Sequence, residues 1–210
     1  MRPFVIDIDV ADASLTGFAS NVTGATFVLT ATAPTDGLAH QVSIKNDTAN
    51  DHAGKTITLV GTDADGKAQT EDVTGPGNAA TVESTKYFKT LTSATPSATI
   101  GADTFDIGWV DEVASASLAL NHKSESPATL AVNVTGTIDF TVQETFDAMQ
   151  GAGFDPQQDA AWCPITALTS KTADVVAAAT LGATAVRLLV NSYSSAAELQ
   201  MNVNQPSGAI

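Results

Sequence analysis

Apolar and polar residues alternate with a period of two along much of the chain. In the segment Thr56–Thr62, Ile57 and Leu59 fall on one side, and threonines and Val60 fall on the other. The same alternation recurs in residues 137–143 and 198–204. A period of two is typical of a half-buried antiparallel strand, so each segment is predicted to be one.

Short segments rich in Gly, Pro, Asn and Asp punctuate a longer series of candidate strands. The further predicted strands are Phe4–Val10, Ala25–Thr32, His40–Lys45, Lys67–Val73, Ala79–Phe88, Phe105–Val110, Ser117–Asn121, Thr129–Val134 and Thr184–Val190. Helical pattern is scarce: residues 142–151 fit a strand entering a turn or one short helix ended by Gly151, and residues 170–179 fit one helical turn capped by Ser170. Many short strands with regular turns predict an all-β sandwich or barrel.

A change of pattern near Ala114–Ser117 suggests a domain boundary. The chain has 210 residues, enough for two small domains of about 100 residues each. We predict two β-sandwich modules, jelly-roll or immunoglobulin-like, with little helix: residues 1–114 and residues 115–210. A single larger sandwich is the alternative.

The charge balance narrows the range of partners. The net charge is −14, with nine Lys and Arg, so direct binding to nucleic acid or to an anionic membrane is not expected. No apolar stretch is long enough for a membrane-spanning helix. Asp7 and Asp9 interrupt the apolar run near the start, which argues against a signal peptide.

Two aspartates and a glycine form a D-x-D-G arrangement at Asp63, Asp65 and Gly66. As a calcium loop of the EF-hand type it fails: Lys67 occupies a ligand position, Gly66 comes too early, and Thr74 stands where a bidentate Glu is needed. Asp-Gly between strands of matching length is instead a strong hairpin signal. A turn is predicted, with a weak surface cation site at Asp63 and Asp65 as the alternative.

No residue pattern predicts a catalytic, metal or cofactor site, and an enzyme is not expected. His40, His52 and His122 lack metal-ligand spacing and are predicted to be ordinary surface residues. Cys163 stands between Trp162 and Pro164, which predicts a packed, inert thiol.

Paired carboxylates are numerous, but the aromatic content of 6% offers few sugar platforms for a glycosidase. The pairs are Asp7/Asp9, Asp63/Asp65, Glu71/Asp72 and Asp111/Glu112. Asp7 and Asp9 lie two residues apart and are predicted to form the solvated face of an edge strand.

Two segments are candidates for a protein interface. Phe154 and Trp162 lie in a long loop, where they either plug the open end of a sandwich or face a partner. At the N-terminus, Phe4, Val5 and Ile6 form an apolar strand. It is either the first strand of its own domain or a strand that pairs with a neighbour's sheet edge.

Two regions resemble structural proteins of tailed bacteriophages. In Ile57–Gly101, a hairpin with "VGTDADGKAQTEDVTGP" is followed by a strand ending in Tyr87-Phe88 and then by "KTLTS". In Val132–Val203, the strand "TIDFTVQETFD", the Trp loop "AAWCPI" and the final "TAVRLLVNSYSSAAELQMNV" hairpin are similar to small virion modules. The resemblance implies no catalytic residues.

This resemblance implies a virion component, and most specifically a capsid decoration, or cement, protein on the outer surface of the head. The single cysteine, Cys163, allows no disulfide within the chain, so synthesis in a reducing bacterial cytoplasm is expected. The expected partners are the major capsid protein, other virion proteins and further copies of the chain, with a trimer favoured. The alternatives are a tail or head–tail connector protein and, in a different class, a carbohydrate-binding adhesion module or a hydrolase domain of a tail fibre.

Overall fold

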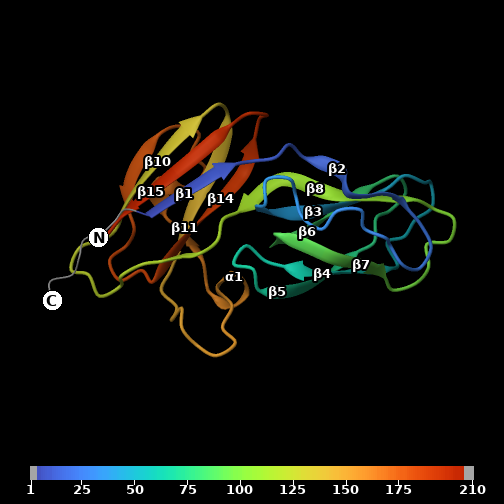
Figure 1. Ribbon diagram of the computed structural model, residues 1–210, viewed down its shortest axis with the longest axis horizontal. Helices are drawn as coiled ribbons and strands as arrows, with labels where there is room; N and C mark the ends of the chain where they lie inside the picture. The colour runs from blue at the N-terminus through green and yellow to red at the C-terminus, as the bar shows by residue number, and fades with distance from the viewer. Residues whose placement is uncertain (1–3, 206–210) are drawn as a thin grey trace. The chain divides into compact units, whose positions relative to one another are not determined.

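The structure is a computed structural model that describes residues 4–205, and it is almost entirely β (Figure 1). The strands are β1 (Phe4–Asp9), β2 (Ser14–Val22), β3 (Ala39–Asn46), β4 (Thr56–Thr62), β5 (Ala68–Thr74), β6 (Thr81–Phe88), β7 (Thr90–Pro96), β8 (Phe105–Ala114), β9 (Leu118–Ala119), β10 (Thr129–Thr135), β11 (Ile138–Thr145), β12 (Cys163–Pro164), β13 (Val175–Ala178), β14 (Ala185–Tyr193) and β15 (Glu198–Asn204). Within residues 4–205, helix is confined to α1 (Pro156–Asp159) and a 3₁₀ turn, Thr166–Leu168. The predicted all-β class with little helix is confirmed.

The chain forms two compact units, and one is inserted within the other in sequence. Ala11–Asp111 make up the inserted unit, and residues 4–10 together with 112–205 make up the flanking unit. The predicted boundaries, 1–114 and 115–210, differ from this division at the N-terminal strand. Strand β1 pairs with β15, the last strand within residues 4–205, and therefore belongs to the flanking unit. Residues 1–3 of the predicted N-terminal segment lie outside the described residues.

The inserted unit is a sandwich of two sheets. One has the order β2-β8-β3-β6 and the other β5-β4-β7. Their inner faces enclose a core that is rich in aromatic rings, among them Phe18, Phe88, Phe105 and Trp109. Phe18 packs edge-on against Trp109, with ring centroids 5.2 Å apart.

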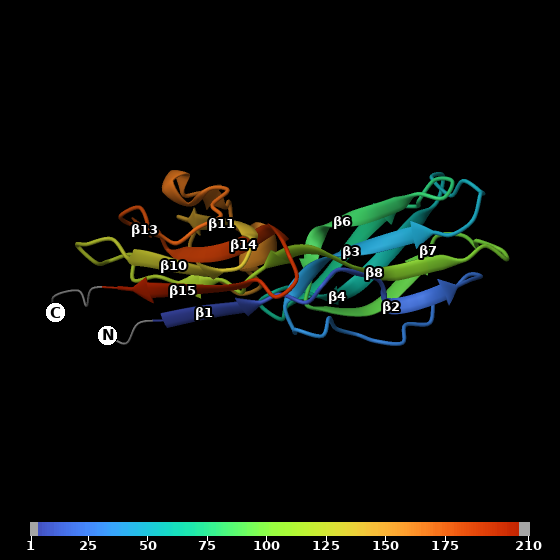
Figure 2. The same ribbon diagram turned by 90° about the horizontal axis from the view of Figure 1, so that it is seen from above.

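The flanking unit is also a two-layer arrangement. One sheet has the order β1-β15-β10-β13, and the other is built on β11 and β14 (Figure 2). The short strand β12 pairs with β11. The remaining edge of β14 pairs first with the end of β8 and then with β9. Between these two pairings, Ser115 contacts β14 through its side chain: its hydroxyl oxygen accepts a hydrogen bond from the Leu188 amide at 2.9 Å. The fully buried side chains include Leu130, Ile138 and Phe140.

Strands were missed where the period of two is interrupted. The β2 segment lacks regular alternation because its pairing with β8 shifts register twice, and Gly17 is required where the Trp109 ring covers the backbone. Ala25–Thr32 is not a strand, although Phe27 is buried in the core. Residues 170–179 hold strand β13 and not a helical turn. Among the described residues no helix is long and apolar enough to cross a membrane.

Candidate interaction surfaces

The D-x-D-G segment is the turn of the β4–β5 hairpin, as predicted. Strands β4 and β5 pair from Thr56↔Thr74 to Thr62↔Ala68. The buried Asp63 carboxylate accepts hydrogen bonds from the backbone amides of Asp65 and Lys67, both at 2.9 Å. Gly66 adopts φ +78°, which favours glycine. Asp63 therefore organises the loop through backbone donors.

Glu71 and Asp72, a predicted carboxylate pair, point to opposite faces of β5. Glu71 ties β5 to β6: its two oxygens accept from the Thr85 amide at 2.7 Å, the Thr85 hydroxyl at 2.8 Å and the Lys86 amide at 2.9 Å. Asp72 is exposed and accepts only from the Thr58 hydroxyl, at 2.7 Å, among the hydrogen bonds recorded for it. Glu71 thus serves the scaffold and does not converge with its neighbour on a reacting group.

His40 is buried, which contradicts the prediction of a surface histidine. Its Nδ1 contacts the Val110 carbonyl at 2.7 Å and its Nε2 contacts the Asp36 carboxylate at 2.8 Å. Both neighbours of the ring are hydrogen-bond acceptors. Burial alone raises the pKa of Asp36, but hydrogen bonds from His40 and from the amides of Ala11 and Leu38 outweigh it and lower the pKa. The His40–Asp36 pair therefore stabilises the inserted unit from within.

His52 is also buried, and the surface prediction is wrong for it too. Lys55 donates to its Nδ1 at 2.8 Å, which leaves Nε2 to donate to Asp103, also at 2.8 Å. The ring packs edge-on against Phe105. Hydrogen bonds from Asn50 and then from His52 lower the pKa of Asp103. His122 is exposed, as predicted.

The loop carrying the predicted interface residues Phe154 and Trp162 is anchored to its own unit. The Trp162 indole donates to the Pro156 carbonyl at 2.7 Å, and the Arg187 guanidinium lies over its ring at 4.6 Å from the centroid. Arg187 also donates to the side chain of Gln157, at 2.7 Å. Phe154 and Trp162 are both half-buried. These contacts tie the loop to its own unit, and both the plug and the partner-facing role stay predictions.

Cys163 is exposed, so the predicted packed thiol is wrong. It belongs to the two-residue strand β12, which pairs with Gln143 and Glu144 of β11 at the margin of the sheet. Trp162 turns toward Arg187, and Pro164 is itself exposed, so neither neighbour covers the sulfur.

Among the strands of residues 4–205, β1 lies at one end of its sheet and pairs with β15 (Figures 1 and 2). Ile8 points into the core and is 1% exposed, whereas Phe4 is 43% and Val5 48% exposed. Ile6 is intermediate. The predicted interface residues Phe4, Val5 and Ile6 therefore lie on a true edge strand, and Asp7 and Asp9 are solvated as predicted.

The outer face of this sheet carries a compact acidic area. Asp7 stands opposite Gln200, and Asp9 stands opposite Glu198. Asn133 and Thr135 of β10 continue the same two rows. A shallow hollow of about 350 Å³ lies over these positions. Sequence inspection missed Glu198 as part of the area, because it is 189 positions beyond Asp9 and only the β1–β15 register joins them.

Two other hollows lie in the flanking unit. One, of about 640 Å³, combines apolar Leu120, Phe146 and Met149 with the cationic side chain of Lys123. Phe146 is 52% exposed there, and no sequence pattern had singled it out.

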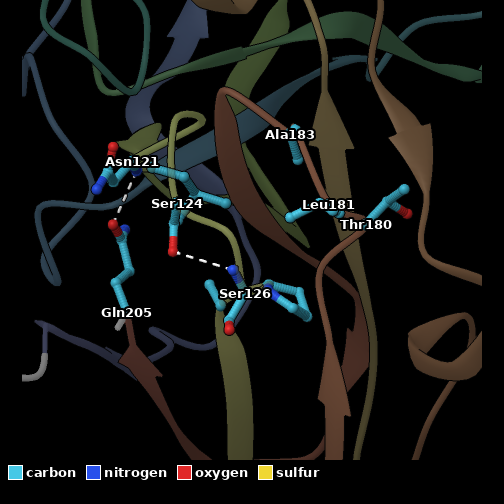
Figure 3. A pocket seen from close by; sticks show the side chains of 11 residues that line it. Asn121, Ser124, Ser126, Thr180, Leu181, Ala183 and Gln205 are labelled. Atoms are coloured by element: carbon cyan, nitrogen blue, oxygen red, sulfur yellow. Dashed lines mark hydrogen bonds between the residues drawn. The ribbon is translucent and has the colours of Figure 1, made fainter. Parts of the chain in front are cut away.

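The second hollow, between the 121–128 loop and residues 180–183, is closed on one side by Gln205 (Figure 3). The Gln205 side-chain oxygen accepts from the Asn121 amide at 2.8 Å, and Ser124 accepts from the Ser126 amide at 3.3 Å. Its volume of about 10 Å³ holds no more than about one water molecule.

Within residues 4–205 no group of three or more His, Cys, Asp or Glu side chains is placed to hold a metal ion. No family model matches the sequence. No curated protein matches it either. Among solved structures, the chain is similar to the major capsid protein P2 from bacteriophage PM2, at 7% identity over 97% of this chain and 98% of that one, with a TM-score of 0.22. That value is too low to support an argument about fold or function.

Proposed function

We propose that this protein is a structural component of a tailed-phage virion, and specifically a decoration protein on the outside of the head. The observation that carries the proposal is the resemblance of Ile57–Gly101 and Val132–Val203 to phage virion modules. The first segment begins in β4 and contains the β4–β5 hairpin, and the second runs from β10 into β15. Both coincide with sheet-forming parts of the chain.

The physical character of the molecule supports a docking role without a catalysed reaction. Several of its carboxylates already serve as hydrogen-bond acceptors within the scaffold, as Asp63, Glu71 and Asp36 do. The net charge of −14 keeps free copies apart before assembly. The exposed edge strand β1 offers backbone groups and apolar side chains to a neighbour.

In this proposal, the overall affinity for the capsid comes from many copies that bind at once. Many copies docking on a symmetric capsid lattice gain avidity, so each contact can be weak. A cyclic oligomer, with a trimer favoured, presents several docking surfaces at once. The major capsid protein is the proposed partner, and the shell gains resistance to internal pressure.

The test combines a map with a binding experiment. Purified protein is added to expanded capsids that lack it, and the particles are imaged by cryo-electron microscopy. Decoration predicts density repeated over the whole capsid lattice, and capsids that withstand higher temperature once decorated. Density confined to a ring at the tail vertex of the native particle would contradict decoration and favour the tail or connector alternative.

The adhesion alternative predicts an exposed aromatic ring on which a sugar can stack, and neither tryptophan offers two open ring faces. Trp109 is 4% exposed and donates to the Asp12 carbonyl at 3.1 Å, so it offers no open ring face. One side of Trp162 is covered by Arg187. Titration with host polysaccharide while Trp162 fluorescence is followed tests the alternative, and saturable quenching would favour adhesion over decoration.

A further inference from the structure

The outer edge of β1 combines two properties that point to one kind of partner. It ends a four-stranded sheet, so backbone N–H and C=O groups of alternate residues face away from β15. It also carries Asp7 and Asp9 on one face, with Ile6 and Ile8 alternating on the other. An added strand would therefore meet acidic side chains above and apolar side chains below.

The acidic side is built from both strands of the edge. Asp9 and Glu198 stand directly opposite each other across the β1–β15 pair, which places their Cβ atoms about 5 Å apart. Like charges at that position repel. No Lys or Arg of residues 4–205 is recorded in an ion pair with Asp7, Asp9 or Glu198. Positive charge from a partner would relieve this repulsion.

We propose that β1 receives an extended, Lys- or Arg-bearing segment of a partner protein as an additional strand. Asp7 and Asp9 are two residues apart, or about 6.8 Å along the strand. Basic residues at alternate positions of the incoming strand match that spacing. The hollow of about 350 Å³ over Asp7, Asp9 and Glu198 accommodates their side chains. Phe4 and Val5, the first two residues of β1, are exposed and supply apolar contact.

A second copy of this chain is a poorer occupant of the same edge. Pairing β1 with itself brings four aspartates to one seam, and each copy carries a net charge of −14. Charge complementarity therefore favours a basic partner. In the proposed virion role that partner would be another virion protein, and only this identification rests on the proposed function.

The test uses the full chain, labelled with ¹⁵N, and a capped synthetic peptide in which Lys alternates with Val, about as long as β1. The expected result is saturable shifts of the amides of Phe4–Asp9 and of Glu198, with binding that weakens as salt is added. The matched peptides have Glu in place of Lys, or a central Pro that removes a backbone donor. Both are expected to bind much more weakly.

Variants localise the contact. The double variant Asp7→Lys/Asp9→Lys is expected to weaken peptide binding roughly tenfold, because two attractive pairs become repulsive. The control Glu83→Lys/Glu125→Lys makes the same charge change at two exposed positions that belong to neither β1 nor β15 and is expected to leave binding unchanged.

Three results would overturn the inference: no binding of the Lys peptide, equal binding of the Glu peptide, or shifts that fall outside β1 and β15. A concentration-dependent dimer that protects the β1 amides would also overturn it, since the occupant would then be a second copy. The peptide experiment involves no virion, so a negative result there would not contradict the proposed decoration of capsids. Conversely, a failure to decorate capsids would not contradict the proposed binding of basic segments at β1.

Discussion

Acidic residues inside the inserted unit and those on the outer face of β1 and β15 behave in opposite ways. In the inserted unit, Asp36 and Glu71 each accept several hydrogen bonds that join one segment to another. On the outer face of β1 and β15, Asp9 and Glu198 are exposed and face each other. A carboxylate beside backbone donors stabilises the fold, and one without them stays available to an outside partner.

Each unit carries one tryptophan, which allows the contrast to be measured separately in each. Trp109 lies in the inserted unit and Trp162 in the flanking unit. Changing one of them to Phe leaves the other as the reporter of its own unit. Urea denaturation can therefore give the free energy of unfolding of the inserted unit from Trp109 and that of the flanking unit from Trp162.

The largest effect is expected at Asp36. Asp36→Ala removes the carboxylate that contacts the buried His40 and accepts from the Ala11 and Leu38 amides, and it should lower the free energy of unfolding of the inserted unit by about 3 kcal/mol. Urea denaturation followed by Trp109 fluorescence measures it. Asp65→Ala, in the β4–β5 turn of the same unit, is the comparison variant. An Asp36 variant within error of wild type would mean that the pair contributes nothing.

The Asp36 carboxylate also makes the stability of the inserted unit depend on pH. Its pKa in the folded protein is below its ordinary value of 3.8, so it contributes stability above that value. The contribution is lost as the pH falls through the lower folded pKa. Asp36→Asn should flatten the fall in stability at acidic pH, leaving the part due to Asp103, whose pKa is also lowered. An unchanged acid slope would contradict this assignment.

A smaller effect separates the neighbours Glu71 and Asp72. Glu71→Ala removes the acceptor for three hydrogen bonds from β6, and we expect a loss of about 1.5 kcal/mol. Asp72→Ala removes one bond to an exposed hydroxyl, and we expect less than about 0.5 kcal/mol. Equal losses would remove the distinction between a clamping and a solvated carboxylate.

In the flanking unit, Arg187→Ala tests whether Arg187 holds the loop that carries Trp162 in place. It removes the cation over the indole and the hydrogen bond to Gln157, with an expected loss of about 1 kcal/mol. Iodide quenching of Trp162 should increase, whereas Lys123→Ala, an exposed loop variant, should leave it unchanged. No rise in quenching would mean that Arg187 does not cover the ring.

The smallest effect is expected at the acidic edge. Asp7→Lys/Asp9→Lys should change the stability of the flanking unit by less than about 0.5 kcal/mol, because neither residue is buried and Asp9 is relieved of its repulsion with Glu198. Denaturation followed by Trp162 fluorescence checks it. A large loss would place these carboxylates among the structural ones and would weaken the proposed docking edge.

The sequence by itself determined the all-β class, the β4–β5 hairpin and most strand positions. These depend on local rules: a period of two marks a half-buried strand, and Asp-Gly marks a turn. Local rules also identified Asp7 and Asp9 as a solvated face. They failed at β2, where bulges break the period, and at the surface or buried character of His40, His52 and Cys163.

Only the tertiary structure decided which distant residues became neighbours. The alternation of β1 does not specify its partner, and pairing with β15 joins Asp9 to Glu198 across almost the whole chain. His40 is buried because Asp36 and the Val110 carbonyl meet it there, and nothing in its own neighbourhood signals the carbonyl 70 residues away. Side-chain patterning fixes which face of a strand is buried, whereas the choice of sheet partner depends on packing of the whole core.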